Sequence, residues 1–127
     1  MTNTESVAFR PLDIDEPEGR LIAYEVGGKI TAEQAKVLFD RIEKAAAEDR
    51  KLRLYYELHG FPTSEASVML EKLKRMGTIL KTIERVAIVG DQRWLGVYAA
   101  IFDPFTKMKL RRFKNEEKDA ALAWIRE

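Results

Sequence analysis

The stretch that most constrains this fold is residues 86–105, which read VAIVGDQRWLGVYAAIFDPF. Its first four residues, Val86–Val89, are apolar and mostly β-branched, without polar alternation. Such a run is typical of a parallel strand buried on both faces, so we expect it in the centre of a sheet. After the turn at Gly90–Asp91, no residue from Trp94 to Phe102 carries a charge. We expect a helix there, and a helix that is apolar nearly all round must be buried or must contact another apolar surface.

Composition restricts the classes of partner and site. The chain has 127 residues with a net charge of +1, which predicts one domain with no nucleic-acid partner. It has no cysteine, so disulfides, thiol catalysis and cysteine metal sites are excluded. The first twenty residues hold no apolar core, and no uncharged run reaches the roughly 18 residues that span a bilayer. We therefore expect a cytoplasmic protein that contacts a membrane at most peripherally.

The rest of the chain alternates strand-like and helix-like segments. Thr31 and Gln34 form the pattern of a capping box, which predicts a helix over residues 32–48. Further helices are expected over residues 65–82, over residues 94–102, and after a cap at Asn115. The expected strands are Val7–Leu12, Leu21–Val26, Leu52–Leu58, Val86–Val89 and Met108–Phe113. This order predicts a disordered segment over residues 1–6 and, over residues 7–127, one α/β domain with a mixed sheet of four to five strands and helices packed mainly on one side.

Several motifs in this order resemble the SpoIIAA-like family of small bacterial proteins, which combines STAS and CRAL-TRIO character. The matching motifs are Gly28–Thr31, Arg85–Asp91, Trp94, Phe102–Phe105, Arg112–Phe113 and Ala121–Ile125. The resemblance covers roughly residues 20 to 127. It implies kinship to anti-anti-sigma factors and to CRAL-TRIO lipid carriers, and a mobile apolar helix near Trp94 that is associated with membranes or apolar ligands.

One loop departs from the pattern of the anti-anti-sigma factors. Those proteins carry a phosphorylatable Asp-Ser pair after the strand that corresponds to Leu52–Leu58, whereas residues 57–64 here read ELHGFPTS. This difference argues against classical partner switching. Thr63, Ser64 and Ser67 remain candidates for a regulatory loop, with helix capping as the ordinary explanation for hydroxyl residues at such a position.

The segment from Trp94 onward has three interpretations. It is core, or it contacts a lipid-like ligand or a membrane, or it forms a subunit interface, as in a homodimer. Gly96, Ala99 and Ala100 form a narrow face that would lie close to the sheet. The large apolar residues that would then bind a ligand or membrane are Trp94, Leu95, Val97, Tyr98, Ile101, Phe102 and Phe105.

Basic residues flank this segment. Lys107, Lys109 and Arg111 would share one face of the following strand, and Arg93 stands at the other end of the segment. A solvated strand face explains these residues by itself. Contact with anionic head groups is the alternative, because each basic residue near such a surface adds about 1 kcal/mol.

Nothing in the sequence forms a recognisable catalytic or metal-binding pattern. His59 is the only histidine and has no second histidine or cysteine at ligand spacing. Gly27–Gly28 and Gly90 lack the spacing and the lysine of a phosphate loop. We therefore expect no cofactor, no metal and no enzyme. The sequence favours a small non-enzymatic binding module for an apolar or lipid-like ligand or an anionic membrane. The alternative is a STAS-type regulatory domain that binds a protein partner without the usual Asp-Ser motif.

Overall fold

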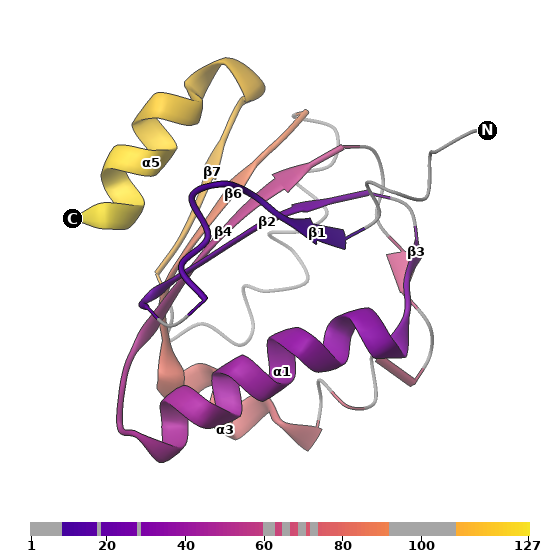
Figure 1. Cartoon of the computed structure of the whole chain (residues 1–127). Coiled ribbons are helices and arrows are strands. Elements are labelled where there is room, and N and C mark those ends of the chain that lie inside the picture. Colours follow the sequence, from indigo (N-terminus) through magenta and orange to yellow (C-terminus); the bar gives the residue numbers. More distant parts are fainter. Residues whose placement is uncertain are drawn as a thin grey trace.

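The computed structural model describes residues 9–17, 19–27, 29–59, 63–64, 67–68, 71, 74–91 and 109–127. Its main feature is a mixed five-stranded sheet (Figure 1). In spatial order the strands are β1 (Phe9–Pro11), β2 (Leu21–Val26), β4 (Leu52–Leu58), β6 (Ile83–Val89) and β7 (Lys109–Phe113). Strand β1 is antiparallel to β2, and every other pair is parallel. The predicted α/β class and mixed sheet are confirmed.

Strand β6 occupies the interior of the sheet, as its apolar sequence predicts. It pairs in parallel with β4 on one side and with β7 on the other. Val86 is 2% exposed and the next three residues are fully buried, because helices cover both faces of the sheet at this point. The strand begins three residues earlier than expected, at Ile83, which pairs with Leu52 and is itself buried.

Helix α1 (Ala32–Ala47) begins at the predicted capping box. The Thr31 hydroxyl accepts a hydrogen bond from the Gln34 backbone N–H at 3.2 Å, and the Gln34 side chain accepts one from the Thr31 N–H at 2.9 Å. Two otherwise unpaired donors of the first turn are thereby satisfied. The helix ends before Asp49, whose φ of 57° turns the chain toward β4.

The helix expected over residues 65–82 is not continuous in the part that the structure describes. Residues 67–68, 71 and 74 are helical, Arg75 is a turn, and α3 spans Met76–Thr82. Gly77 in the first turn of α3 weakens local helix formation. The Arg75 side chain bonds Glu71 at 3.2 Å and Glu43 of α1 at 3.1 Å, so contacts with α1 hold the chain at this break.

A second, two-stranded sheet replaces part of the loop expected over residues 59–64. Strand β3 (Lys29–Ile30) pairs in parallel with β5 (Thr63–Ser64). The loop expectation is therefore wrong at Thr63 and Ser64, because their backbone pairs with the segment that follows β2. Local sequence does not indicate this pairing, since its partner lies more than thirty positions away.

The helices form two layers around the main sheet (Figure 1). Helices α1 and α3 contact each other and cover one face, with a core that includes Ile22, Phe39 and Ile88. Helix α5 (Lys118–Arg126) covers the other face, where its buried Trp124 joins a core with Tyr55 and Ala87 of the sheet. The expected cap at Asn115 is instead the first residue of a 3-10 turn, η3 (Asn115–Glu117). Glu117 occupies the N-cap position of α5, and its carboxylate accepts a hydrogen bond from the Lys114 N–H at 2.7 Å.

Candidate functional site

The carboxyl ends of the parallel strands form the edge where open α/β sheets usually bind ligands. Two glycines allow the chain segments to approach closely at this edge. A Cβ on Gly27 would meet the His59 carbonyl oxygen at 2.6 Å, and a Cβ on Gly90 would meet the Leu58 Cβ at 3.1 Å. A side chain at Gly27 would therefore separate the ends of β2 and β4.

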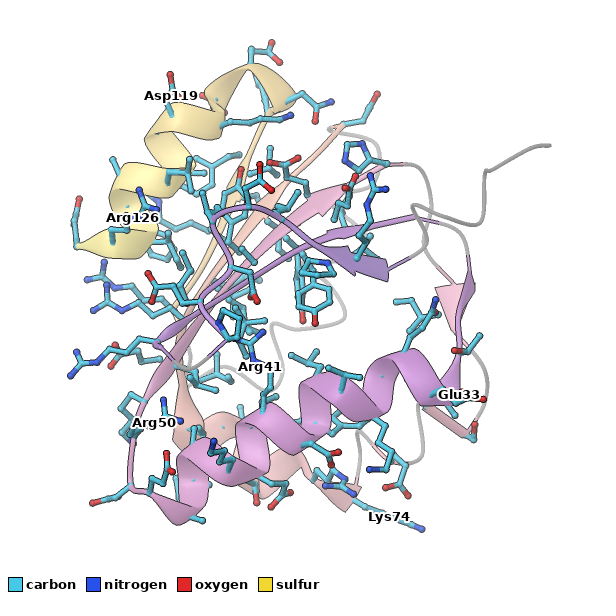
Figure 2. All side chains as sticks on the ribbon, in the orientation of Figure 1. Glu33, Arg41, Arg50, Lys74, Asp119 and Arg126 are labelled. Carbon is cyan, nitrogen blue, oxygen red and sulfur yellow. The ribbon has the colours of Figure 1, made fainter. Side chains whose placement is uncertain are left out.

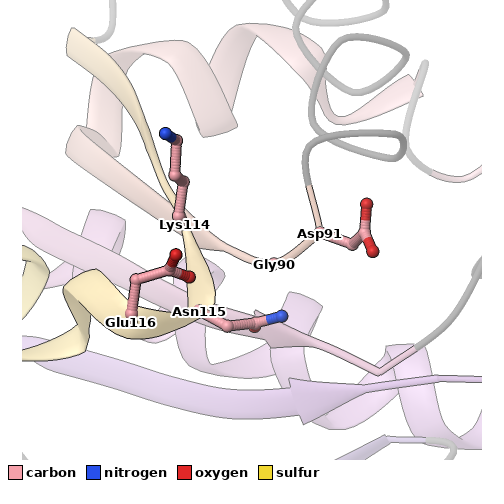
Figure 3. Close-up of a pocket in the computed structure, with 5 residues that line it drawn as sticks. All are labelled: Gly90, Asp91, Lys114, Asn115 and Glu116. Atoms are coloured by element: carbon pink, nitrogen blue, oxygen red, sulfur yellow. The ribbon is translucent and has the colours of Figure 1, made fainter.

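A shallow hollow of about 270 Å³ lies at this edge, between the ends of β6 and β7. Gly90 and Asp91 border it from β6, and Lys114, Asn115 and Glu116 border it from the turn after β7 (Figure 3). The Gly90 N–H donates to the Phe113 carbonyl at 3.0 Å and holds the two strand ends together. The lining is polar and charged, so the hollow suits water or a small polar group rather than an apolar ligand.

A cluster of charged side chains lies at the same edge of the sheet, at the ends of β2 and β4. Glu25 and Glu57 are direct neighbours across the two strands. The His59 Nε2 is 3.4 Å from Glu25 Oε1 and 3.7 Å from Glu57 Oε1. Arg10 of β1 contacts Glu25 at 2.7 Å. Both carboxylates are mostly shielded from water, so the nearby cations offset the cost of placing two negative charges side by side.

The same cluster connects β4 to helix α5. The buried Tyr55 hydroxyl donates to Glu57 Oε2 at 2.9 Å, and the Lys118 Nζ lies 3.5 Å from Glu57 Oε1. Burial, reinforced by the bond to Glu57, raises the pKa of Tyr55 above its ordinary range. The phenol therefore stays protonated near neutral pH and acts as a hydrogen-bond donor.

This arrangement is suited to holding elements together more than to chemistry. Each carboxylate has a cationic partner, and Tyr55 is fully buried. Within the described ranges, no group of three histidine, aspartate or glutamate side chains is arranged to hold a metal ion.

Comparisons with known proteins concern the family and the fold of the chain. A sequence model of the family described as SpoIIAA-like matches residues 21–126. The chain belongs to the SpoIIAA-like family. A search of curated protein sequences found no match. A crystal structure of an uncharacterized protein of the DUF3478 family from Shewanella loihica PV-4, with a SpoIIAA-like fold, resembles this SpoIIAA-like chain with a TM-score of 0.64. The two are 22% identical, and the similarity covers 92% of this chain and 90% of the other, which shows a shared fold.

The predicted ligand-binding residues of this SpoIIAA-like chain lie outside the described residues. This holds for Trp94, Leu95, Val97, Tyr98, Ile101, Phe102 and Phe105, and for the basic residues Arg93 and Lys107. Ser67 is exposed and helical. Among the helices that the structure describes, none is long and apolar enough to span a bilayer.

Two of the predicted basic residues, Lys109 and Arg111, lie in β7. Lys109 is its first residue and pairs with Arg85 of β6. Arg111 is exposed, and its guanidinium carbon lies 5.3 Å from the ring centroids of both Phe113 and Trp124. Arg85 lies 5.2 Å from the same Trp124 ring, so the indole contacts two guanidinium groups.

Sequence reasoning did not find the cluster around Glu57. It placed His59 in a loop without ligand partners, whereas the structure places the imidazole near Glu25 and Glu57. What brings the cluster together is the register of β2 against β4. It places Glu25 opposite Glu57, although the two residues are more than thirty positions apart in sequence. A single sequence carries no direct record of that register.

Proposed function

We propose that this SpoIIAA-like chain is a small, non-enzymatic binding module. Residues Trp94–Phe105 engage an apolar or lipid-like ligand or a membrane surface, and the protein is cytoplasmic and peripheral at the membrane. The proposal is supported by where apolar residues are found in the chain. In the described part, Val37 is the one large hydrophobic side chain that is exposed, at 52%. The sequence of residues 94–102, in contrast, is a continuous run without any charged residue.

The size of the apolar contribution supports this function. Burying a large apolar side chain is worth about 1.5–3 kcal/mol relative to leaving it in water. Trp94, Tyr98 and Phe102 recur at helical spacing in the sequence, and tryptophan and tyrosine suit the interface between lipid and water. A few such side chains are sufficient for reversible attachment and insufficient for permanent anchoring.

The alternative function is a STAS-type regulatory domain that binds a protein partner. Its support is the family fold together with the exposed position of Ser67, which follows β5. Substituting Ser67 with glutamate would then change partner binding while leaving lipid binding intact.

Vesicle binding tests the main proposal. The wild type should co-sediment with vesicles of neutral phosphatidylcholine or bind a fluorescent fatty acid, and Trp94→Glu/Phe102→Glu should lose both activities. Val37→Glu is the control, because it places a single glutamate, half the charge added by the double variant, on an exposed apolar position of α1. Folding of each variant is checked by far-UV circular dichroism.

Two results would contradict the proposal. In the first, the folded wild type ignores both probes at low salt. In the second, the double variant binds as well as the wild type. If the double variant changes only the oligomeric state, the segment is a homodimer interface and the lipid function is wrong.

A further inference from the structure

A row of basic residues crosses the sheet at the amino ends of its parallel strands. Arg53 of β4 is the direct neighbour of Arg85 of β6, and Arg85 is the direct neighbour of Lys109 of β7. Arg53 and Arg85 lie opposite one another on adjacent strands and share a face, and like charges in such positions repel. These two charges therefore need a stabilising partner.

The carboxyl terminus of α5 supplies part of that partner. The Arg53 guanidinium donates to the Ile125 carbonyl at 2.8 Å, and Arg85 donates to the Trp124 carbonyl at 2.7 Å. The last carbonyls of a helix are unpaired and carry partial negative charge, which favours cations there. Glu84 also pairs with Arg53 at 2.8 Å. These contacts account for Arg53 and Arg85.

Two further arginines at this edge make no hydrogen bond to the helix carbonyls and no ion pair in the described part of the chain. Arg111 lies on the same indole ring as Arg85, and Arg126 directly follows Ile125. Both are exposed, and neither has an acidic partner within 4.0 Å among the residues that the structure describes. We name Arg53, Arg85, Arg111 and Arg126 the amino-edge basic surface. Figure 2 shows Arg126 at the end of α5, and Lys74 far from it, below α1.

The amino edge also carries acidic side chains, and they face the two arginines that bind the helix carbonyls. Glu84 pairs with Arg53, and Glu127 Oε1 lies 3.9 Å from the Arg85 guanidinium. The charges of Arg111 and Arg126 are therefore the ones at this edge that remain available to an anionic surface.

We propose that the amino-edge basic surface faces the head groups of an anionic membrane. This inference rests on the proposed function, because reversible attachment normally combines a modest apolar contact with a basic patch. Strand β7, which carries Arg111, begins directly after residues 92–108, which include the uncharged run. The uncharged run and the first basic residues of β7 are therefore close together along the sequence.

The test is binding to vesicles with and without phosphatidylglycerol, using Arg111→Gln/Arg126→Gln. Glutamine keeps part of each stem while removing both charges. We expect binding to anionic vesicles to weaken roughly 30-fold, since each basic residue near such a surface contributes about fivefold. Binding to phosphatidylcholine vesicles should stay at the wild-type level. The wild type should also lose its preference for anionic vesicles as salt rises, because exposed charges are screened over about 10 Å at 0.1 M.

The matched control is Lys36→Gln/Lys74→Gln, which removes two exposed charges from α1 and from the segment before α3. It should bind anionic vesicles as the wild type does. The inference is overturned if the control weakens binding to anionic vesicles as much as the arginine variant does, or if neither double variant changes that binding. It is also overturned if the amino-edge basic surface binds only an acidic protein. Binding to neutral vesicles distinguishes this inference from the proposed function. If Trp94→Glu/Phe102→Glu loses that binding and the arginine variant keeps it, the proposed function is upheld even where this inference fails.

Discussion

The two edges of the parallel sheet differ in how their charges are paired. At the carboxyl edge, Glu25 and Glu57 contact Arg10, His59 and Lys118. At the amino edge, Arg53 and Arg85 bind helix carbonyls and also face Glu84 and Glu127. The exposed Arg111, whose guanidinium lies over aromatic rings, and Arg126 have no acidic partner in the described part of the chain. Paired charges between elements act mainly in folding, whereas unpaired exposed charges remain available to a partner.

Helix α5 connects the two edges. Its first residue, Lys118, contacts Glu57 at the carboxyl edge, and its last turn accepts hydrogen bonds from Arg53 and Arg85 at the amino edge. The helix therefore fixes the position of both charged groups relative to the sheet. Substitutions in α5 and in its partners can therefore distinguish residues that stabilise the fold from residues that are proposed to bind a membrane.

Trp124→Ala should have the largest effect on stability. The ring is 9% exposed and contacts Phe113, Arg85 and Arg111. Its removal leaves a cavity and should lower the free energy of unfolding by about 3–5 kcal/mol. Urea denaturation measures this loss. Val37→Ala on α1 serves as the exposed control and should change stability by less than about 0.5 kcal/mol. A small effect of Trp124→Ala would show that α5 contributes little to the core.

Tyr55→Phe should have an intermediate effect at the carboxyl edge. It removes the hydrogen bond to Glu57 and should cost about 0.5–1.5 kcal/mol at pH 7. The raised pKa of Tyr55 also predicts a pH dependence. Below about pH 10 the phenol is protonated in both the folded and unfolded states, and above that pH only the unfolded state ionises.

Wild-type stability should therefore fall as pH rises above about 10, and Tyr55→Phe should fall less steeply. Urea unfolding at several alkaline pH values measures both slopes. Equal slopes for the two proteins would mean that Tyr55 ionises as readily in the folded chain as in the unfolded chain.

Thr82→Val should have the smallest effect. Thr82 lies where α3 meets β6, is 1% exposed, and its hydroxyl has no hydrogen-bond partner among the residues that the structure describes. Valine has nearly the same shape and removes the unpaired polar atom, so stability should stay the same or rise by up to about 1 kcal/mol. Thermal denaturation measures the change. A clear loss would indicate that the hydroxyl does bond a neighbour.

Local patterns were sufficient for much of the fold. The apolar run at Val86–Val89 predicted a central parallel strand, and Thr31 with Gln34 predicted the start of α1. Both features depend on residues close together in the chain, and both are confirmed. The family was also recognisable from the order of its motifs, and the family match confirms it.

Contacts between distant segments decided the rest. The break at Arg75, the pairing of Thr63–Ser64 with β3, and the position of His59 beside Glu25 all join residues far apart in sequence. The basic row of Arg53, Arg85 and Lys109 exists only because the parallel strands align in one register. Sequence by itself determined the strands of the main sheet and the start of α1, because burial and capping patterns are local. Only the tertiary structure decided which charges meet, because register is set by packing across the whole sheet.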